Sequence, residues 1–181
     1  MVAITLDGEL AATELKENLK QRISELSKVS VTPGLGTILV GDDGPSKNYI
    51  AMKHRDCKEL GMHSKEIALP GDTSQQEILE AVEAFNQDPQ IHAFIIQYPF
   101  PNGLDYESAL LEVLPHKDAD GLHPINLGRL VQGIDAPLAC TPAGIQLLLE
   151  RFDVPISGQH VVIIGRGLTI GRPLANLLAL K

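Results

Sequence analysis

The sequence has little cysteine, no excess of positive charge and no long apolar run, and each shortage argues against a class of protein. Its formal net charge is −8 and its pI is about 5.2. Nucleic acids and anionic membranes both need a basic patch that releases counterions, so we expect neither as a partner. No stretch approaches the roughly 18 apolar residues of a membrane-spanning helix. An acidic protein can still bind a small anion locally.

The cysteines and histidines show no metal-binding pattern. Cys57 and Cys140 are the two cysteines, and they lie far apart in the sequence. The six histidines do not pair with cysteine or with one another at ligand spacing. We therefore expect no metal and two reduced thiols, as is typical of a reducing compartment. Residues 1–7 show no basic segment or apolar run of a signal peptide, so the expected location is the cytoplasm.

The chain alternates between two kinds of apolar pattern. Its 181 residues suit one domain or one and a half, at roughly 100–200 residues per domain. Helical periodicity alternates with continuous apolar runs of strand length, which favours an α/β fold with a mainly parallel sheet. The predicted strands are 34–41, 64–69, 92–98 and 160–165, and the predicted helices are 7–29, 46–60, 73–86, 105–114, 125–132, 142–152 and one from 171 onward.

Sequence signals also suggest helix caps and a domain boundary. Ser46 and Thr141 are the expected N-caps of the helices that follow them. The best boundary lies near residues 135–140, which gives domains of 1–138 and 139–181. The second part is too short for an independent sheet, because a dinucleotide-binding half needs several βα units. We therefore expect a Rossmann-type domain that the chain only begins.

A glycine-rich loop follows the last predicted strand. Gly165, Arg166, Gly167 and Gly171 differ from the G-x-G-x-x-G pattern by one inserted residue. Such a loop before a helix suits a pyrophosphate, and Arg166 could bind a 2′-phosphate. A tight turn without a ligand explains the glycines equally well. The acidic residue expected about 20 positions on would fall beyond Lys181, which leaves the choice between NAD and NADP open.

Tyr49, Lys53 and Gln97 are candidate site residues. Tyr49 and Lys53 are one turn apart, so they share a helix face that could hold a planar ligand. Taken alone, they are more simply a half-exposed tyrosine and a surface lysine. A lysine that transfers protons needs its pKa lowered by burial or by a neighbouring cation. Gln97 ends an apolar strand, where ligands gather in parallel sheets, although an ordinary strand-exit glutamine is an even alternative.

The stretch Lys117-Asp118-Ala119-Asp120-Gly121 has the composition of a turn. A solvated loop is the simpler interpretation for Asp118. Asp120 could instead face a pocket and accept hydrogen bonds from an amidine-like edge.

Several motifs, taken in order, resemble the bifunctional methylenetetrahydrofolate dehydrogenase/cyclohydrolases. Residues 40–53 resemble that family's first signature, with Ser46, Tyr49 and Lys53 in place. The further matches are Gln97-Tyr98-Pro99-Phe100-Pro101, Lys117-Asp118-Ala119-Asp120-Gly121 with Asn126 and Gly128, Cys140-Thr141-Pro142-x-Gly144, and Gly165-Arg166-Gly167 with Gly171 and Pro173. Together they cover essentially the whole chain, and their shared order is more specific than any single motif.

The resemblance implies a fold and a pair of activities. It implies an N-terminal three-layer α/β domain that binds folate and carries the catalytic residues, over 1–138, and the start of an NADP-binding Rossmann domain, over 139–181. The implied chemistry is oxidation of 5,10-methylenetetrahydrofolate to 5,10-methenyltetrahydrofolate with NADP, NAD not being excluded. Hydrolysis of the product to 10-formyltetrahydrofolate follows. Tetrahydrofolate derivatives are then the ligands, and a homodimer is the implied assembly.

The resemblance also implies catalytic roles. Lys53 is the acid/base residue of the hydrolysis, Gln97 holds and tunes it, and Tyr49 lies against the folate ring system. The substrate site also includes Tyr98, Pro99 and, at the pterin edge, Asp120.

The cofactor residues implied by the resemblance are Gly165, Arg166, Gly167 and Gly171. The family usually has serine where this chain has Gly167, so one hydroxyl donor is missing beside the NADP phosphates. Short-chain dehydrogenases also use Tyr-x-x-x-Lys, but there the glycine loop precedes the pair, the reverse of the order found here. The second alternative is a folate-binding fragment without dehydrogenase activity, because the cofactor domain is incomplete.

Overall fold

The computed structural model describes residues 3–181, which divide into two compact units. One contains residues 19–119, and we call it the sheet unit. The other, the helical unit, contains residues 3–18 and 120–181. Helix α1 (Gly8–Ser27) supplies residues to both units. The domain division at residue 138 that the sequence suggests stays a prediction.

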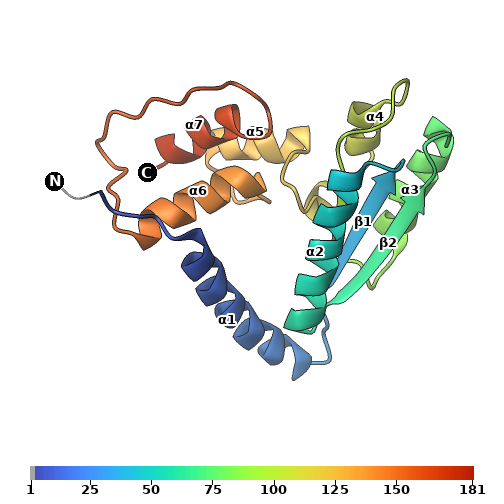
Figure 1. The fold of residues 1–181 in the computed structure, drawn as a ribbon, viewed down its shortest axis with the longest axis horizontal. Helices are drawn as coiled ribbons and strands as arrows, with labels where there is room; N and C mark the ends of the chain where they lie inside the picture. Colours follow the sequence, from blue (N-terminus) through green and yellow to red (C-terminus); the bar gives the residue numbers. More distant parts are fainter. Residues whose placement is uncertain (1–2) are drawn as a thin grey trace. The chain divides into compact units, whose positions relative to one another are not determined.

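The sheet unit is built on a parallel sheet of three strands (Figure 1). The strands β1 (Gly34–Val40), β2 (His63–Leu69) and β3 (Ala93–Ile96) lie in the order β2-β1-β3. Strand β1 is therefore central and is paired along both edges. The predicted α/β class with a parallel sheet is confirmed, and β3 is shorter than the predicted strand 92–98.

Helices cover both faces of this sheet. Successive residues of a strand face opposite sides, so Thr37 and Ile38 of β1 point to different layers. Thr37 contacts His54 of α2 (Gly44–Leu60), whereas Ile38 packs in a cluster with residues of α3 (Gln75–Gln87). Helix α4 (Tyr106–Leu111) packs against α3. The sheet unit thus has the three layers expected from the sequence.

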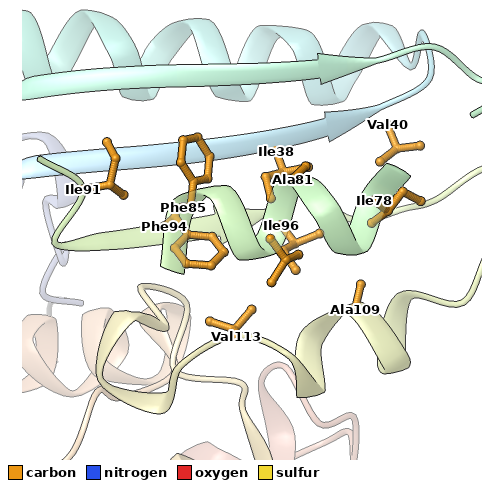
Figure 2. Packing of buried hydrophobic residues seen from close by; sticks show 11 residues of the cluster. Ile38, Val40, Ile78, Ala81, Phe85, Ile91, Phe94, Ile96, Ala109 and Val113 are labelled. Carbon is orange, nitrogen blue, oxygen red and sulfur yellow. The ribbon is translucent and has the colours of Figure 1, made fainter. Parts of the chain in front are cut away.

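The hydrophobic core lies between the sheet and α3 (Figure 2). Helix α3 turns an apolar stripe at helical spacing toward β1 and β3, and the rings of Phe85 and Phe94 meet at 5.4 Å between centroids. The buried members are Ile38, Val40, Ile78, Ala81, Val82, Phe85, Ile91, Phe94, Ile96, Ala109 and Val113. This core fixes β1 and β3, and it therefore also fixes the residues that follow them.

Helices α2, α3 and α4 of the sheet unit all begin with side-chain caps. Ser74 and Glu77 form a reciprocal capping box at the start of α3, close to the start of the helix predicted over 73–86. The expected cap Ser46 is wrong, because the cap of α2 is Asp43, whose carboxylate accepts hydrogen bonds from the amide and hydroxyl of Ser46. Those bonds lower the pKa of Asp43. An acidic residue two positions before Pro45 was the overlooked signal.

The helical unit contains α5 (Pro124–Gln132), α6 (Cys140–Arg151) and α7 (Gly171–Ala179), with α7 packed against the other two. The expected cap Thr141 is wrong: α6 begins after Ala139, which offers no side-chain hydrogen bond. Arg151 of α6 forms an ion pair with Glu14 of α1, within the same unit.

The predicted strand 160–165 is wrong. These residues form no strand, and the side chains of Val162 and Ile164 are 74% and 100% exposed. A parallel strand exists only when a neighbour satisfies its backbone groups. Within residues 3–181, no strand lies beside this segment.

None of the helices within residues 3–181 has the length and apolar character that crossing a bilayer requires.

Burial raises the pKa of the Cys57 thiol in α2.

Candidate active site

The structure places Tyr49 and Lys53 on one face of α2, as predicted. The Lys53 ammonium lies 5.8 Å from the centroid of the Tyr49 ring, a distance at which a cation and a ring attract. The Tyr49 side chain is 58% exposed. Within residues 3–181, Lys53 has no carboxylate or hydrogen-bond partner. The pair therefore offers a phenol ring and an unneutralised ammonium to a ligand.

Gln97 lies at the carboxyl end of β3. Its backbone amide donates to the Ile38 carbonyl at 2.9 Å, which extends the pairing of β3 with β1 by one residue. Its side-chain amide nitrogen donates to the Tyr98 carbonyl at 2.8 Å. This bond turns the carboxamide toward the chain that follows, and its oxygen remains available as an acceptor.

Aromatic contacts hold the turn after Gln97. Tyr98 and Pro99 are joined by a cis peptide bond. The Tyr98 and Phe100 rings both meet the Tyr106 ring of α4 edge-on, each with centroids 5.3 Å apart. The Tyr98 side chain is nevertheless 65% exposed, so the turn presents an aromatic surface beside the strand end.

The segment 117–119 is fastened to the core of the sheet unit. The Lys117 ammonium donates to the carbonyls of Phe85 and Asp88 at 2.9 and 3.0 Å, which satisfies backbone groups at the end of α3. Asp118 bridges to Phe94 of β3, and the Ala119 amide donates to the Phe94 carbonyl. The solvated loop expected for Asp118 is wrong, because this bridge holds it against the sheet edge at 3% exposure.

Asp120 comes next and begins the second segment of the helical unit. It is half-buried, and its carbonyl accepts a hydrogen bond from the Cys140 amide. Gly121 has a φ of +66°, and a Cβ there would lie 2.1 Å from the carbonyl carbon of Leu138. Only glycine permits this close approach, so Gly121 fixes the backbone immediately beside Asp120.

The glycine loop closes on its own backbone. Gly171 is buried at the start of α7, and a Cβ there would lie 2.3 Å from the Gly165 carbonyl oxygen. The Arg172 amide donates to the Gly167 carbonyl at 3.1 Å. Arg166 and Gly167 are exposed on this loop. A compact backbone loop that is exposed to solvent and leads into a helix is the arrangement that suits a phosphate group.

A cavity of about 650 Å³ lies in the sheet unit. It is lined by the ends of β1 and β2, the turn after β2, and residues of α2 such as Lys47 and Ile50. Tyr49, Lys53 and Gln97 are not among its lining residues. The cavity is therefore distinct from the predicted site. Residues 3–181 also contain no group of three or more histidine, cysteine or acidic residues that could hold a metal ion.

Sequence reasoning missed the anchoring residues around the site. The role of Lys117 depends on carbonyls of α3 that lie far away in the sequence, so no local signal could reveal it. Asp43, by contrast, carries a local signal, since an acidic residue before a proline-containing first turn is a typical N-cap.

Two family models match the chain. Residues 6–120 match the catalytic domain of tetrahydrofolate dehydrogenase/cyclohydrolase, and residues 139–181 match the NAD(P)-binding domain of the same proteins. The fold and these matches define a catalytic α/β domain followed by the beginning of a nucleotide-binding domain.

The chain belongs to the tetrahydrofolate dehydrogenase/cyclohydrolase family. It is 49% identical to the bifunctional protein FolD of Syntrophotalea carbinolica over 181 residues, which is all of this chain and 62% of that relative. The resemblance recognised in the motifs is thereby confirmed. The chain spans about three fifths of the length of the relatives it matches.

Solved structures show the same fold. A bifunctional FolD enzyme from Campylobacter jejuni superimposes with a TM-score of 0.95 at 35% identity, over 98% of this chain and 64% of the other. The methylenetetrahydrofolate dehydrogenase-cyclohydrolase of Trypanosoma brucei, solved with NADP and an inhibitor, gives a TM-score of 0.93 at 31% identity, over 98% and 61%.

Proposed function

We propose that this chain provides the folate site, and the beginning of the NADP site, of a bifunctional methylenetetrahydrofolate dehydrogenase and methenyltetrahydrofolate cyclohydrolase. The observation that carries the proposal is the Tyr49–Lys53 pair on α2, in a chain that belongs to this family. An ammonium with no anionic partner among residues 3–181, beside an exposed ring, suits a planar, proton-accepting substrate.

In the hydrolysis, Lys53 would move the proton. Attack of water on the methenyl carbon needs a group that takes a proton and then returns it to a ring nitrogen. As a neutral amine, Lys53 would take the proton from the attacking water, and the ammonium so formed, which has no carboxylate partner among residues 3–181, would return the proton to the ring nitrogen as the carbon–nitrogen bond breaks. Tyr49 would lie against the folate rings and keep the reacting carbon within reach.

Gln97 and Asp120 would orient the substrate and Lys53. The side-chain amide of Gln97 donates to the Tyr98 carbonyl, and its side-chain oxygen would accept a hydrogen bond from the Lys53 ammonium. The Asp120 carboxylate would accept hydrogen bonds from the pterin edge, and Tyr98 and Pro99 would also contact the substrate. Such orientation matters because both reactions depend on placing the reacting groups correctly.

The loop of Gly165, Arg166, Gly167 and Gly171 would hold the phosphates of NADP. Its closed backbone and the following helix fit an anionic group, and Arg166 adds a positive charge. NADP, when bound, supplies the hydride acceptor for oxidation of the methylene carbon. The choice of NADP over NAD rests on the family and on Arg166.

A second candidate, a folate-binding chain without dehydrogenase activity, is favoured by one observation. Residues 160–165 lead into the glycine loop but form no strand, and Ile164 is fully exposed. A phosphate loop is normally held by a strand inside a sheet. We therefore propose that this chain alone does not oxidise methylenetetrahydrofolate.

The test is hydrolysis of methenyltetrahydrofolate by this chain, followed by absorbance with and without NADP. We expect Lys53→Met to lower the rate by about 10²–10⁴-fold, the usual contribution of general acid–base catalysis. Lys58→Met, on the same helix, is the matched control and should change little. Unchanged hydrolysis in Lys53→Met would contradict the role of Lys53, and NADP-dependent oxidation by the wild-type chain would refute the second candidate.

The assembly and location are proposals as well. The homodimer rests on the family resemblance, and the cytoplasmic location rests on the expectation of two reduced thiols. Sedimentation velocity of the chain, with and without a folate ligand, would test the dimer directly.

A further inference from the structure

Thr37 is a buried polar residue in the middle of an apolar strand. It is 0% exposed, and its neighbours toward the end of β1 are Ile38, Leu39 and Val40. A hydroxyl buried in such surroundings is unfavourable unless it has a hydrogen-bond partner. That partner is His54, whose Nε2 lies 2.9 Å from the Thr37 hydroxyl oxygen.

The His54 ring reaches two strands. Glu66 of β2 is the register partner of Thr37 in β1, so both residues present their side chains to the same face of the sheet. The Glu66 carboxylate lies 3.9 Å from the same nitrogen of His54. One ring on α2 is therefore held between polar groups of adjacent strands.

His54 lies on the helix face that packs on the sheet, together with one other polar residue and two apolar ones. Ser46, Ile50 and Cys57 share this face by helical spacing, and all three are buried. Apolar contacts are not directional, so Ile50 and Cys57 alone tolerate a small rotation of the helix. A hydrogen bond requires a particular distance and angle, so the Thr37–His54 bond sets the rotation of α2.

Lys53 is the residue immediately before His54. Neighbouring residues of a helix differ by about 100° around its axis, so the rotation fixed by His54 also fixes where Lys53 and Tyr49 point. We propose that Thr37 and His54 are positioning residues, which aim the Tyr49–Lys53 pair by holding α2 in one rotation over β1 and β2. That this orientation of the Tyr49–Lys53 pair matters for catalysis rests on the proposed function, whereas the orientation itself does not.

The test compares Thr37→Val with Thr37→Ser. Valine keeps the shape and removes the hydroxyl, whereas serine keeps the hydroxyl. The readout is the NMR signal of the Lys53 side-chain terminus, assigned with Lys53→Arg, with the Lys58 signal as an internal reference. We expect Thr37→Val to shift the Lys53 signal and leave that of Lys58 in place, and Thr37→Ser to leave both unchanged.

His54 provides a second pair of variants. His54→Leu should shift the Lys53 signal as Thr37→Val does, and His54→Gln, which keeps a hydrogen-bonding group, should restore it at least in part. In the hydrolysis assay, we expect Thr37→Val to lower kcat on the order of tenfold with a smaller change in KM, because misplacement of a reacting group mainly slows the chemical step.

The outcomes separate the two proposals. An unchanged Lys53 signal in both Thr37→Val and His54→Leu would overturn the positioning role, whatever the activity. A shifted Lys53 signal in a chain whose wild type hydrolyses nothing would support the positioning role and count against the proposed function. A shifted signal with unchanged kcat would overturn the catalytic consequence alone.

Discussion

Two apolar runs in this chain look alike in sequence and differ completely in structure. Residues 34–40 form the central strand β1, and Ile38 there is fully buried. Residues 160–165 carry as many large aliphatic side chains but form no strand, and Ile164 is fully exposed. The difference is the presence of neighbours: β1 pairs with β2 and β3, while no strand of residues 3–181 pairs with 160–165. An apolar run is thus a strand only where its backbone finds partners.

The largest expected difference between the two runs follows from shortening one isoleucine side chain in each. Ile38→Ala removes a fully buried side chain from the core, and we expect it to lower the free energy of unfolding by about 2–5 kcal/mol. Ile164→Ala removes the same atoms from a fully exposed position, and we expect a change within about 0.5 kcal/mol. Urea unfolding followed by circular dichroism measures both. Equal losses would show that residues 160–165 are packed in solution.

A second prediction concerns the loop that follows the exposed run. Gly171→Ala brings a Cβ to within 2.3 Å of the Gly165 carbonyl oxygen, so the backbone of the loop must shift. We expect the free energy of unfolding to fall by about 1–3 kcal/mol, as for other strained substitutions. Amide hydrogen exchange at the start of α7 should become faster.

Gly144→Ala is the matched control for that change. Gly144 lies in α6 with nothing within 4 Å of an added Cβ, so alanine should stabilise the helix by up to about 1 kcal/mol. If the two alanine variants behaved alike, the close approach of Gly165 and Gly171 would not exist in solution.

The smallest expected effect is a pH dependence of the stability of α3, the helix that covers β1. Hydrogen bonds from the Ser74 amide and hydroxyl, and from the Thr73 hydroxyl, lower the pKa of Glu77 at the start of α3. The unfolded chain lacks these bonds and binds the proton more readily. The stabilisation is therefore complete above the ordinary glutamate pKa of about 4.3 and is lost as the pH falls through the lower value of the folded chain.

Hydrogen exchange of the first turn of α3 between neutral and acidic pH measures this loss. Glu77→Gln should weaken the pH dependence, because the glutamine side chain does not titrate in this range. Glu80→Gln changes another glutamate on the same helix and should retain it. A dependence that survived in Glu77→Gln would have to come from another carboxylate.

Much of the candidate site follows from the sequence, because its signals are local. The spacing of Tyr49 and Lys53 places them on one face of whatever helix contains them, and that helix ends at Gly61 as predicted. The position of Gln97 follows from the apolar run before it. The glycines of residues 165–171 predict a tight turn, and the closed loop is what they form.

Other features could not be predicted, because their partners lie far away in the sequence. Asp118 has the composition of a solvated turn but is buried through a bridge to Phe94. Lys117 looks like a surface lysine, yet it binds carbonyls at the end of α3. The caps at Ser46 and Thr141 were wrong for a different reason, since each depends on the residue at which the helix begins.

The amino-acid sequence by itself determined the family, the alternation of helices and strands, and the residues that share each helix face. These properties depend on residue types and on spacings of a few positions. Only the tertiary structure decided which apolar run became a strand, how Asp118 was buried, and that Thr37 and His54 meet over the sheet. Each of these depends on a hydrogen-bond partner supplied by a distant segment, and such a partner exists only once the chain has folded.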